Sequence, residues 1–244
     1  MDSASAAAVI IGNEVLTAKV PELNGAHLIK RLRERGVPLS GVWVVPDDVD
    51  AIVEAVLAAR RRARWVVTSG GIGPTHDDVT VRAVALALGR KVVLLPEMEA
   101  LVRRYFGESV TAAHRRLAEA PEGSELIFQD TTHFPVLACE HVYLLPGVPQ
   151  LFRWQLEAVL ARLPHQPVFA RALYLDATEA AIASTLDAVA LAFPHVPIGS
   201  YPTFDREADY RVKLTVEHRD AAEADAVVAR LRSSLPAGAI LREE

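Results

Sequence analysis

The hydrophobic positions in the first two thirds of the chain form short apolar runs that alternate with amphipathic stretches. A short apolar run bounded by turn residues predicts a buried strand, and apolar residues spaced by three and four predict a helix. The pattern predicts strands at residues 6–12, 39–45, 64–68 and 91–95. It predicts helices at residues 24–35, 48–61 and 78–88. This alternation requires crossover connections, so we expect an α/β domain with a doubly wound, mainly parallel sheet.

The region that follows belongs to the same domain but has a different pattern. Residues 97–119 are mostly helical in character with a break near Gly107, and we expect them to form a flap over the sheet. Short strands of antiparallel character are predicted at residues 125–128, 134–139 and 141–145. A final helix is predicted at residues 150–163. The first domain is therefore expected to span residues 1–165.

A second, smaller domain is predicted over residues 168–244, after a linker bracketed by Pro164 and Pro167. Its pattern predicts strands at 168–175, 196–201, 209–217 and 239–242, and helices at 178–191 and 220–233. This order is a split β-α-β-β-α-β arrangement, which forms an α+β domain. It contains no glycine-rich phosphate loop and no acidic cluster, so we expect an accessory role in packing or oligomerisation.

Composition narrows the class of protein. Of the 244 residues, 51% are hydrophobic, which is enough to fill a sizeable core. No apolar run approaches the roughly 20 residues of a membrane helix, and no basic residue precedes the N-terminal apolar stretch as it would in a signal peptide. Cys139 is the only cysteine, which excludes an internal disulfide and a cysteine-based zinc site. We therefore expect a cytoplasmic protein that does not bind a membrane.

The charge distribution argues against a nucleic-acid partner. The net charge is −5, and the basic residues are scattered except for a run at residues 60–64. That run fits the C-terminal end of a helix, where cations complement the helix dipole, better than a binding patch. Nucleic acid is therefore not expected as a partner.

The most informative segment is TSGGIGPTHDDVT, residues 68–80, in which an apolar strand leads through a glycine-rich turn into a helix. Gly70, Gly71 and Gly73 can adopt positive φ, so consecutive backbone N–H groups can turn towards one point. Such a nest at a helix N-terminus suits a phosphate or a similar oxyanion. The three glycines are therefore candidate ligand-binding residues.

Two carboxylates follow this loop. Asp77 and Asp78 would repel a bare anion unless a hard cation lies between them and it, so the segment predicts metal-assisted chemistry on a phosphorylated ligand. The simpler interpretation is a capping box, with Thr75 as the N-cap and Asp78 three residues later. Because a plain cap does not need three glycines, we favour the functional interpretation and retain Thr75 as a ligand-binding candidate.

Other polar residues are predicted to meet the loop at the same edge of the sheet. Ligands of a doubly wound sheet bind at the carboxyl ends of its strands, and Glu14, Asp47 and the glycine loop follow the first, second and third predicted strands. Their convergence predicts a binding site, to which we add Asn24. The structural alternatives are a solvated loop carboxylate for Glu14 and helix caps for Asp47 and Asn24.

Carboxylates in this number suit a divalent cation such as Mg²⁺, Mn²⁺ or Co²⁺, with Asp47, Asp77 and Asp78 as the candidate ligands. The cation would lower the pKa of a bound water and neutralise charge on a diphosphate. Asp47, Asp78 and His76 are the candidate catalytic residues. His76 is interpreted either as a proton carrier or phosphate donor, or as a solvated loop residue.

A second proline-flanked turn, LPGVP, follows a predicted strand and opens a helix. Its Pro146 and Gly147 either shape the other wall of the pocket or form only a tight turn with proline at the helix start. There is no G-x-x-x-x-G-K-[ST] motif, which argues against a P-loop nucleotide enzyme. The G-G-x-G here follows the third predicted strand and is not the fingerprint of a dinucleotide fold, which argues against a nicotinamide dehydrogenase.

These segments resemble the molybdopterin-binding MoaB/Mog superfamily, in particular its CinA-type branch and the molybdopterin-binding-like domain of eukaryotic FAD synthases. The matching segments span most of residues 8–155 and are IGNEVL with Asn24, VVPDD, TSGGIGPTHDDVT and LPGVPQLF. The third is highly specific, and the others support it by order and spacing. The second domain, with IGSYPTF and YRVKLTVE, is similar to the small domain that follows in CinA-type proteins. Neither an amidohydrolase domain nor an FAD-synthesising domain is expected within the printed sequence.

The resemblance implies two activities. CinA-type domains and their FAD-synthase relatives imply metal-dependent hydrolysis of a nucleotide diphosphate such as ADP-ribose or FAD. Mog-type members imply binding or adenylylation of molybdopterin, for which the carboxylates that match Asp47 and Asp78 are essential. A non-catalytic ligand-binding module is a third possibility. Lys19 and Gly25 depart from the CinA pattern and bear on the substrate. The resemblance also implies a homo-oligomer, a dimer or a trimer.

Overall fold

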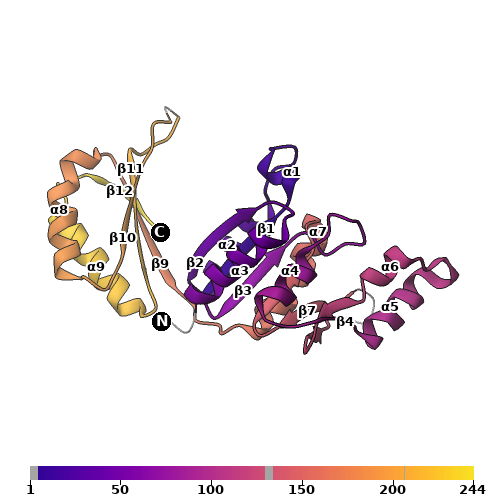
Figure 1. Ribbon diagram of the computed structural model, residues 1–244. Helices are drawn as coiled ribbons and strands as arrows, with labels where there is room; N and C mark the ends of the chain where they lie inside the picture. Colours follow the sequence, from indigo (N-terminus) through magenta and orange to yellow (C-terminus); the bar gives the residue numbers. More distant parts are fainter. Residues whose placement is uncertain (1–4, 130–133, 206) are drawn as a thin grey trace. The chain divides into compact units, whose positions relative to one another are not determined.

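The computed structural model describes residues 5–129, 134–205 and 207–244. The chain divides into two compact units, Met1–His165 and Gln166–Glu244. Figure 1 shows the elements of each unit along the chain. Within the described residues, no helix is long and apolar enough to cross a membrane.

The first unit is built around a six-stranded sheet, as the alternating pattern predicted. Its strand order is β2-β1-β3-β8-β7-β6. In that order the strands are Leu39–Val45, Ala6–Ile11, Trp65–Ser69, Val142–Leu145, Val136–Cys139 and Glu125–Ile127. β2, β1, β3 and β8 pair in parallel, whereas β7 and β6 join as antiparallel strands. The expected mainly parallel sheet is confirmed.

Helices cover both faces of this sheet, because β1 is apolar on both of its sides. Ala6, Ala8 and Ile10 pack in one hydrophobic cluster with residues of α2 (Asn24–Arg35) and α7 (Pro149–Arg162). The intervening residues of β1 pack in a second cluster with residues of α3 (Val49–Arg62) and α4 (Thr80–Ala87). Successive side chains of a strand point to opposite faces, so a fully buried strand must be apolar throughout. The result is a three-layer α/β/α domain.

The region between α4 and β6 differs from expectation. It contains β4 (Val92–Leu94), α5 (Pro96–Phe106), a 3₁₀ turn η1 (Gly107–Ser109), α6 (Ala112–Arg116) and β5 (Glu119–Pro121). The helix breaks at Gly107, as predicted. However, β4 does not join the main sheet but pairs antiparallel with β5 in a separate two-stranded ribbon. The expected helix up to residue 119 was wrong at its end, because pairing with β4 overrides the helical propensity of that stretch.

The second unit is a small α+β domain. Its elements are β9 (Phe169–Leu175), α8 (Glu179–Ala192), β10 (Ile198–Pro202), β11 (Val212–His218), α9 (Ala221–Ser234) and β12 (Ile240–Glu243). The sheet order is β10-β11-β9-β12, and every pair is antiparallel. Residues of both helices and of the inner strands share one hydrophobic cluster. The split β-α-β-β-α-β arrangement is confirmed.

Candidate functional site

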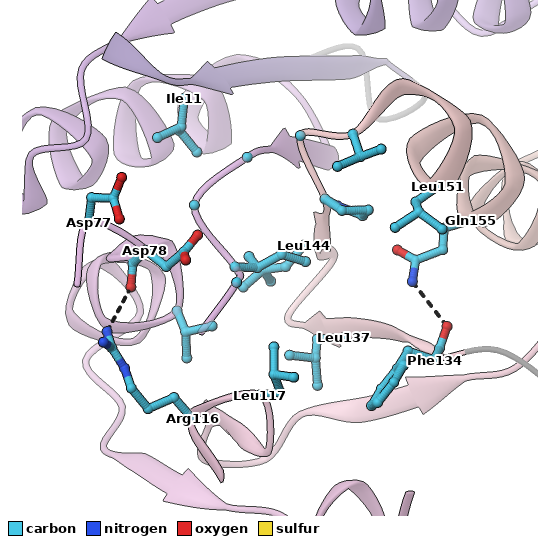
Figure 2. Close-up of a pocket in the computed structure, with 18 of the residues that line it drawn as sticks. Ile11, Asp77, Asp78, Arg116, Leu117, Phe134, Leu137, Leu144, Leu151 and Gln155 are labelled. Atoms are coloured by element: carbon cyan, nitrogen blue, oxygen red, sulfur yellow. Dashed lines mark hydrogen bonds between the residues drawn. The ribbon is translucent and has the colours of Figure 1, made fainter. Parts of the chain in front are cut away.

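A cleft of about 600 Å³ opens in the first unit where parallel strands of the main sheet end. Ile11 at the end of β1, Asp47 after β2, Gly70 after β3 and Pro146 after β8 all line it. Figure 2 shows this cleft with residues that line it. The carboxyl ends of the strands therefore form the binding edge, as expected for a doubly wound sheet.

At Gly70 and Gly71, the glycine loop after β3 has a conformation that only glycine fits, whereas Gly73 does not adopt the expected positive φ. Gly70 has φ of 106°, and a Cβ there would lie 2.2 Å from the carbonyl oxygen of Ile11. Gly71 has φ of 66°, and its Cβ would lie 2.3 Å from Thr80 Oγ1. Thr80 in turn donates from Oγ1 to the Gly70 carbonyl at 2.8 Å and from its backbone N–H to the Gly71 carbonyl at 2.9 Å. Thr80 thus holds the loop closed against the first turn of α4.

The loop leaves backbone donors available beside the cleft. Within the part of the chain that the structure describes, the N–H groups of Gly71, Ile72 and Gly73 have no hydrogen-bond partner. All three residues line the cleft. Three consecutive free N–H groups ahead of a helix N-terminus form the kind of nest that binds an anion.

Asp78 closes a turn ahead of α4. Its Oδ2 accepts hydrogen bonds from the Thr75 backbone N–H at 2.8 Å and from the Thr75 hydroxyl at 2.5 Å. The helix begins only at Thr80, with Val79 as the residue before it, so the capping-box interpretation with Thr75 as N-cap was wrong. Asp78 lines the cleft, and its carboxylate lies against Gly73, where a Cβ would be 2.6 Å from Oδ2.

Asp77 and His76 are more exposed. The polar Thr75 side chain, and then the backbone N–H of Asp77 itself, hold the pKa of Asp77 below its usual value, and His76 and Arg116 lower this pKa further. Asp77 lines the cleft as an ionised carboxylate. The His76 side chain is 99% exposed, with Nδ1 3.8 Å from Asp77 Oδ1. Among the described residues that line the cleft, neither His76 nor Thr75 appears.

Glu14 and Asp47 reach the cleft from the ends of the first two strands. Glu14 lies in α1 (Asn13–Leu16), a short helix that the sequence pattern did not predict. The Asn13 backbone N–H donates to Asp47 Oδ2 at 2.8 Å and so joins the two loops. The cap of α3 is Asp48, whose Oδ1 accepts from the Ala51 N–H at 2.9 Å, so the alternative that Asp47 caps this helix was wrong.

Asn24 supports the loops of the site by hydrogen bonds and does not line the cleft. It is only 5% exposed, and its Nδ2 donates to Ser69 Oγ at 2.9 Å and to the Gly147 carbonyl at 2.8 Å. The N-cap of α2 is Leu23, so the capping alternative for Asn24 was wrong. Gly147 and the adjacent Pro146 line the cleft, and Pro149 is the first residue of α7. The LPGVP segment is therefore both a cleft wall and a proline-started helix.

The donor set fits a cation that arrives with a phosphorylated ligand. Among the described residues, there is no group of three His, Cys, Asp or Glu side chains that could hold a metal ion. Asp47, Asp77 and Asp78 nevertheless line the same cleft. Mg²⁺ is commonly bound through only one or two carboxylates, with water and substrate phosphates completing the shell. The carboxylates therefore fit a cation that the substrate helps to coordinate.

Arg116 adds a cation that the sequence analysis did not single out. It ends α6 and donates from Nη2 to the Asp78 carbonyl at 3.2 Å, as the dashed line in Figure 2 shows. It lines the cleft beside the glycine loop. An arginine next to an anion-binding loop is suited to phosphate contact. Its sequence signal is weak, because Arg116 lies in a helix rich in basic residues and remote from the loop.

The other side of the cleft is apolar and was also not anticipated. Figure 2 shows Gln155 of α7 and Phe134 on the side opposite Asp77, Asp78 and Arg116. Between these two sides lie the apolar residues Leu117, Leu137 and Leu144. These residues come from segments that read as ordinary core or helix in the sequence, so no local pattern indicates their role.

A three-layer α/β domain with a glycine nest, carboxylates and an arginine at the carboxyl edge of its sheet is typical of domains that bind a small anionic ligand. Residues 7–165 match the family model described as "Probable molybdopterin binding domain". The chain belongs to this family, and the resemblance noted in the sequence is confirmed. Residues 167–244 match the family model described as "FAD synthase, middle domain".

The chain is similar to proteins of different lengths. A protein of Archaeoglobus fulgidus is 34% identical over 195 residues, which cover 80% of this chain and 84% of that protein. A probable FAD synthase of Caenorhabditis elegans is 30% identical over 259 residues, which cover 95% of this chain and 50% of that protein. This chain thus spans about half the length of that relative. The crystal structure of the protein CinA of Thermoplasma acidophilum, described as of unknown function, matches 66% of this chain and 99% of its own, with a TM-score of 0.62 and 29% identity.

Proposed function

We propose that the first unit hydrolyses the diphosphate linkage of a nucleotide such as ADP-ribose or FAD, together with Mg²⁺, Mn²⁺ or Co²⁺. The observation that carries this proposal is the presence of an anion nest, three aspartates and an arginine in one cleft of about 600 Å³. A cleft of this size accommodates a ligand of nucleotide dimensions. The similarity to a probable FAD synthase supports a nucleotide ligand.

Each polar group has a part in this reaction. The N–H groups of residues 71–73 bind one phosphate, and the Arg116 guanidinium offsets its charge. The carboxylates of Asp78, Asp77 and Asp47 would hold a cation, which when bound would supply charge neutralisation and a water of lowered pKa. Water attacks one phosphorus and the P–O–P bond breaks, so the bridging oxygen leaves with the other phosphate. ADP-ribose then yields AMP and ribose 5-phosphate, and FAD yields AMP and FMN.

His76 has a limited part in this proposal. Its side chain is almost fully exposed and pairs loosely with Asp77. A histidine in that position can exchange a proton with bulk water but is not held against the cleft floor. We retain His76 as a proton carrier between the cleft and solvent. The variant His76→Ala tests this role, and we expect it to lower the hydrolysis rate at neutral pH by less than about tenfold.

The experiment that tests the hydrolase is a product assay on the purified chain. ADP-ribose and FAD are incubated separately with Mg²⁺, Mn²⁺ and Co²⁺, and AMP is quantified by chromatography. Asp78→Asn keeps an acceptor for Thr75 but removes the charge, and we expect a rate loss on the order of 100-fold. Asp50→Asn is the matched control, because Asp50 is exposed on α3 and does not line the cleft. Equal rates for the two variants contradict the proposal.

A second candidate function is the binding or adenylylation of molybdopterin in cofactor biosynthesis. The family model that matches residues 7–165 favours it, since its description names molybdopterin binding. Tight pterin binding without diphosphate hydrolysis would support this candidate over the first. If neither substrate class is turned over or bound tightly, the third possibility, a non-catalytic ligand-binding module, remains.

A further inference from the structure

The cleft has two chemically different sides, and the proposed function uses only one of them. The phosphate side carries the glycine loop, Asp77, Asp78 and Arg116, whereas the opposite side is formed by Phe134, Gln155 and leucine side chains (Figure 2). Leu117, Leu137 and Leu144 form the floor between the two sides, so this floor is apolar. An apolar surface of this kind suits a planar ring and not a further phosphate.

Gln155 is the buried polar group on that opposite side. It is 7% exposed, and its Nε2 donates to the carbonyl oxygen of Phe134 at 3.0 Å and to that of Pro135 at 3.5 Å. These two carbonyls fix the orientation of the amide, because an amide oxygen turned towards them would face two acceptors. Both N–H groups of Gln155 are therefore used by the protein.

The amide oxygen of Gln155 takes no part in these hydrogen bonds. Oε1 is buried, and among the described residues it has no hydrogen-bond partner. Figure 2 shows this oxygen directed into the cleft, away from Phe134. A buried acceptor without a partner is unfavourable, so a ligand that supplies an N–H donor there gains a hydrogen bond and relieves that cost. Gln155 thus offers the ligand an acceptor and no donor.

We propose that Gln155 is a specificity-determining residue that accepts a hydrogen bond from the exocyclic six-amino group of adenine, with the purine ring on the apolar floor beside Phe134. This proposal rests on the proposed function, because ADP-ribose and FAD share their adenosine diphosphate portion. The Phe134 ring contacts Tyr105, with ring centroids 5.6 Å apart. The phosphates extend from the adenosine towards the glycine loop.

The test compares two ligands that differ by one donor. ADP and purine riboside 5′-diphosphate, which lacks only the six-amino group, are titrated into the full chain with Mg²⁺ by calorimetry. We expect the chain to bind ADP about tenfold more tightly, because a site with a buried acceptor disfavours the ligand that leaves it unpaired. Equal affinities in the unmodified chain overturn the proposal, and so does the absence of ADP binding at millimolar concentration.

Variants of Gln155 show whether this residue selects the ligand or only supports the fold of the site. Gln155→Leu should bind the two diphosphates equally, whereas a residue that only braces the segment at 134–135 would weaken both ligands by the same factor and leave their ratio unchanged. Gln150→Leu is the matched control on the same helix, because Gln150 is exposed and does not line the cleft, and it should keep the tenfold ratio. If Gln155→Leu does not fold, as judged by near-ultraviolet circular dichroism, the affinities of the unmodified chain for the two diphosphates still test the proposal.

The outcomes also separate this proposal from the hydrolase. Selective ADP binding without any hydrolysis supports the adenine assignment and contradicts the hydrolase. Hydrolysis of ADP-ribose with no preference for ADP over purine riboside 5′-diphosphate supports the hydrolase and contradicts the adenine assignment. FMN is the third ligand, since its ring also carries an N–H donor. Binding of FMN that depends on Gln155, with no binding of ADP, overturns the assignment to adenine.

Discussion

Asn24 Nδ2 donates a hydrogen bond of 2.8 Å to the carbonyl oxygen of Gly147, 123 residues further along the chain. The same amide nitrogen donates to Ser69 Oγ at the end of β3. One buried side chain from α2 therefore ties together the ends of β3 and β8, whose loops both line the cleft. Because a Cβ on Gly147 would lie 3.4 Å from Gly70 Cα, the loops also approach each other closely.

Replacement of Asn24 by alanine is predicted to destabilise the first unit. The change removes two hydrogen bonds from a position that is 5% exposed and leaves the Gly147 carbonyl and the Ser69 hydroxyl with one partner fewer. We expect the free energy of unfolding to fall by about 2 kcal/mol, measured by urea denaturation. Ser40→Ala is the control, because it removes only an exposed hydrogen bond to the Arg62 carbonyl. A loss for Asn24→Ala no larger than that for Ser40→Ala would contradict the tie between the loops.

Two glycines with positive φ are predicted to differ in their tolerance of alanine. Gly70→Ala would place a Cβ 2.2 Å from a backbone oxygen, whereas Gly89, with φ of 64°, has nothing within 4 Å of its Cβ position. Gly89→Ala should cost about 1 kcal/mol for the left-handed backbone alone. Gly70→Ala should cost at least about 2 kcal/mol more and abolish ligand binding, since the loop must shift. Thermal unfolding and titration of ADP check both effects, and similar losses for the two variants would show that the loop is not sterically fixed.

The hairpin between β7 and β8 gives a pH-dependent prediction. The hydrogen bond from Arg90, assisted by Arg60, holds the pKa of Glu140 below its usual value. A carboxyl group whose pKa is lower in the folded chain stabilises the fold above the pKa of the unfolded chain, about 4.3, and loses that contribution as the pH falls through the folded value. Glu140→Gln should therefore be less stable at pH 7, by less than about 1 kcal/mol because the pair is partly exposed, and this difference should shrink as the pH falls below about 4. The same difference at pH 7 and pH 3.5 would rule out this ion pair as its source.

Self-association is the fourth prediction. The sheet of the second unit ends at β10, an edge strand on which Tyr201 is 57% exposed, and Phe204 just beyond it is 93% exposed. An uncovered edge strand with apolar side chains favours pairing with another copy. Light scattering should give a mass of at least twice 26.5 kDa at micromolar concentration. Tyr201→Lys should lower that mass, whereas Arg219→Lys, outside the edge strand, should not. A single species of 26.5 kDa for the unmodified chain would refute self-association.

The sequence alone was sufficient for the three-layer α/β class of the first unit, because period and burial are local properties. The residues of β1 are apolar at every position, which predicts a strand covered on both faces, and the helices that cover it carry their own amphipathic periods. The glycine loop was also predictable from the sequence, since positive φ at Gly70 and Gly71 is a requirement of the local backbone. The position of Glu14 and Asp47 in the cleft followed from the rule for strand ends.

Only the tertiary structure decided the rest of the site. Propensity favoured a helix up to residue 119, but β5 forms there because β4 provides a pairing partner. Asn24 was expected at the ligand, and the fold instead places it beneath two loops as their tie. Arg116, Phe134 and Gln155 enter the cleft from three separate segments, and nothing in their own surroundings in the sequence indicates a ligand. A loop encodes its conformation in its own residues, whereas a cleft is formed by distant segments whose meeting depends on the packing of the whole domain.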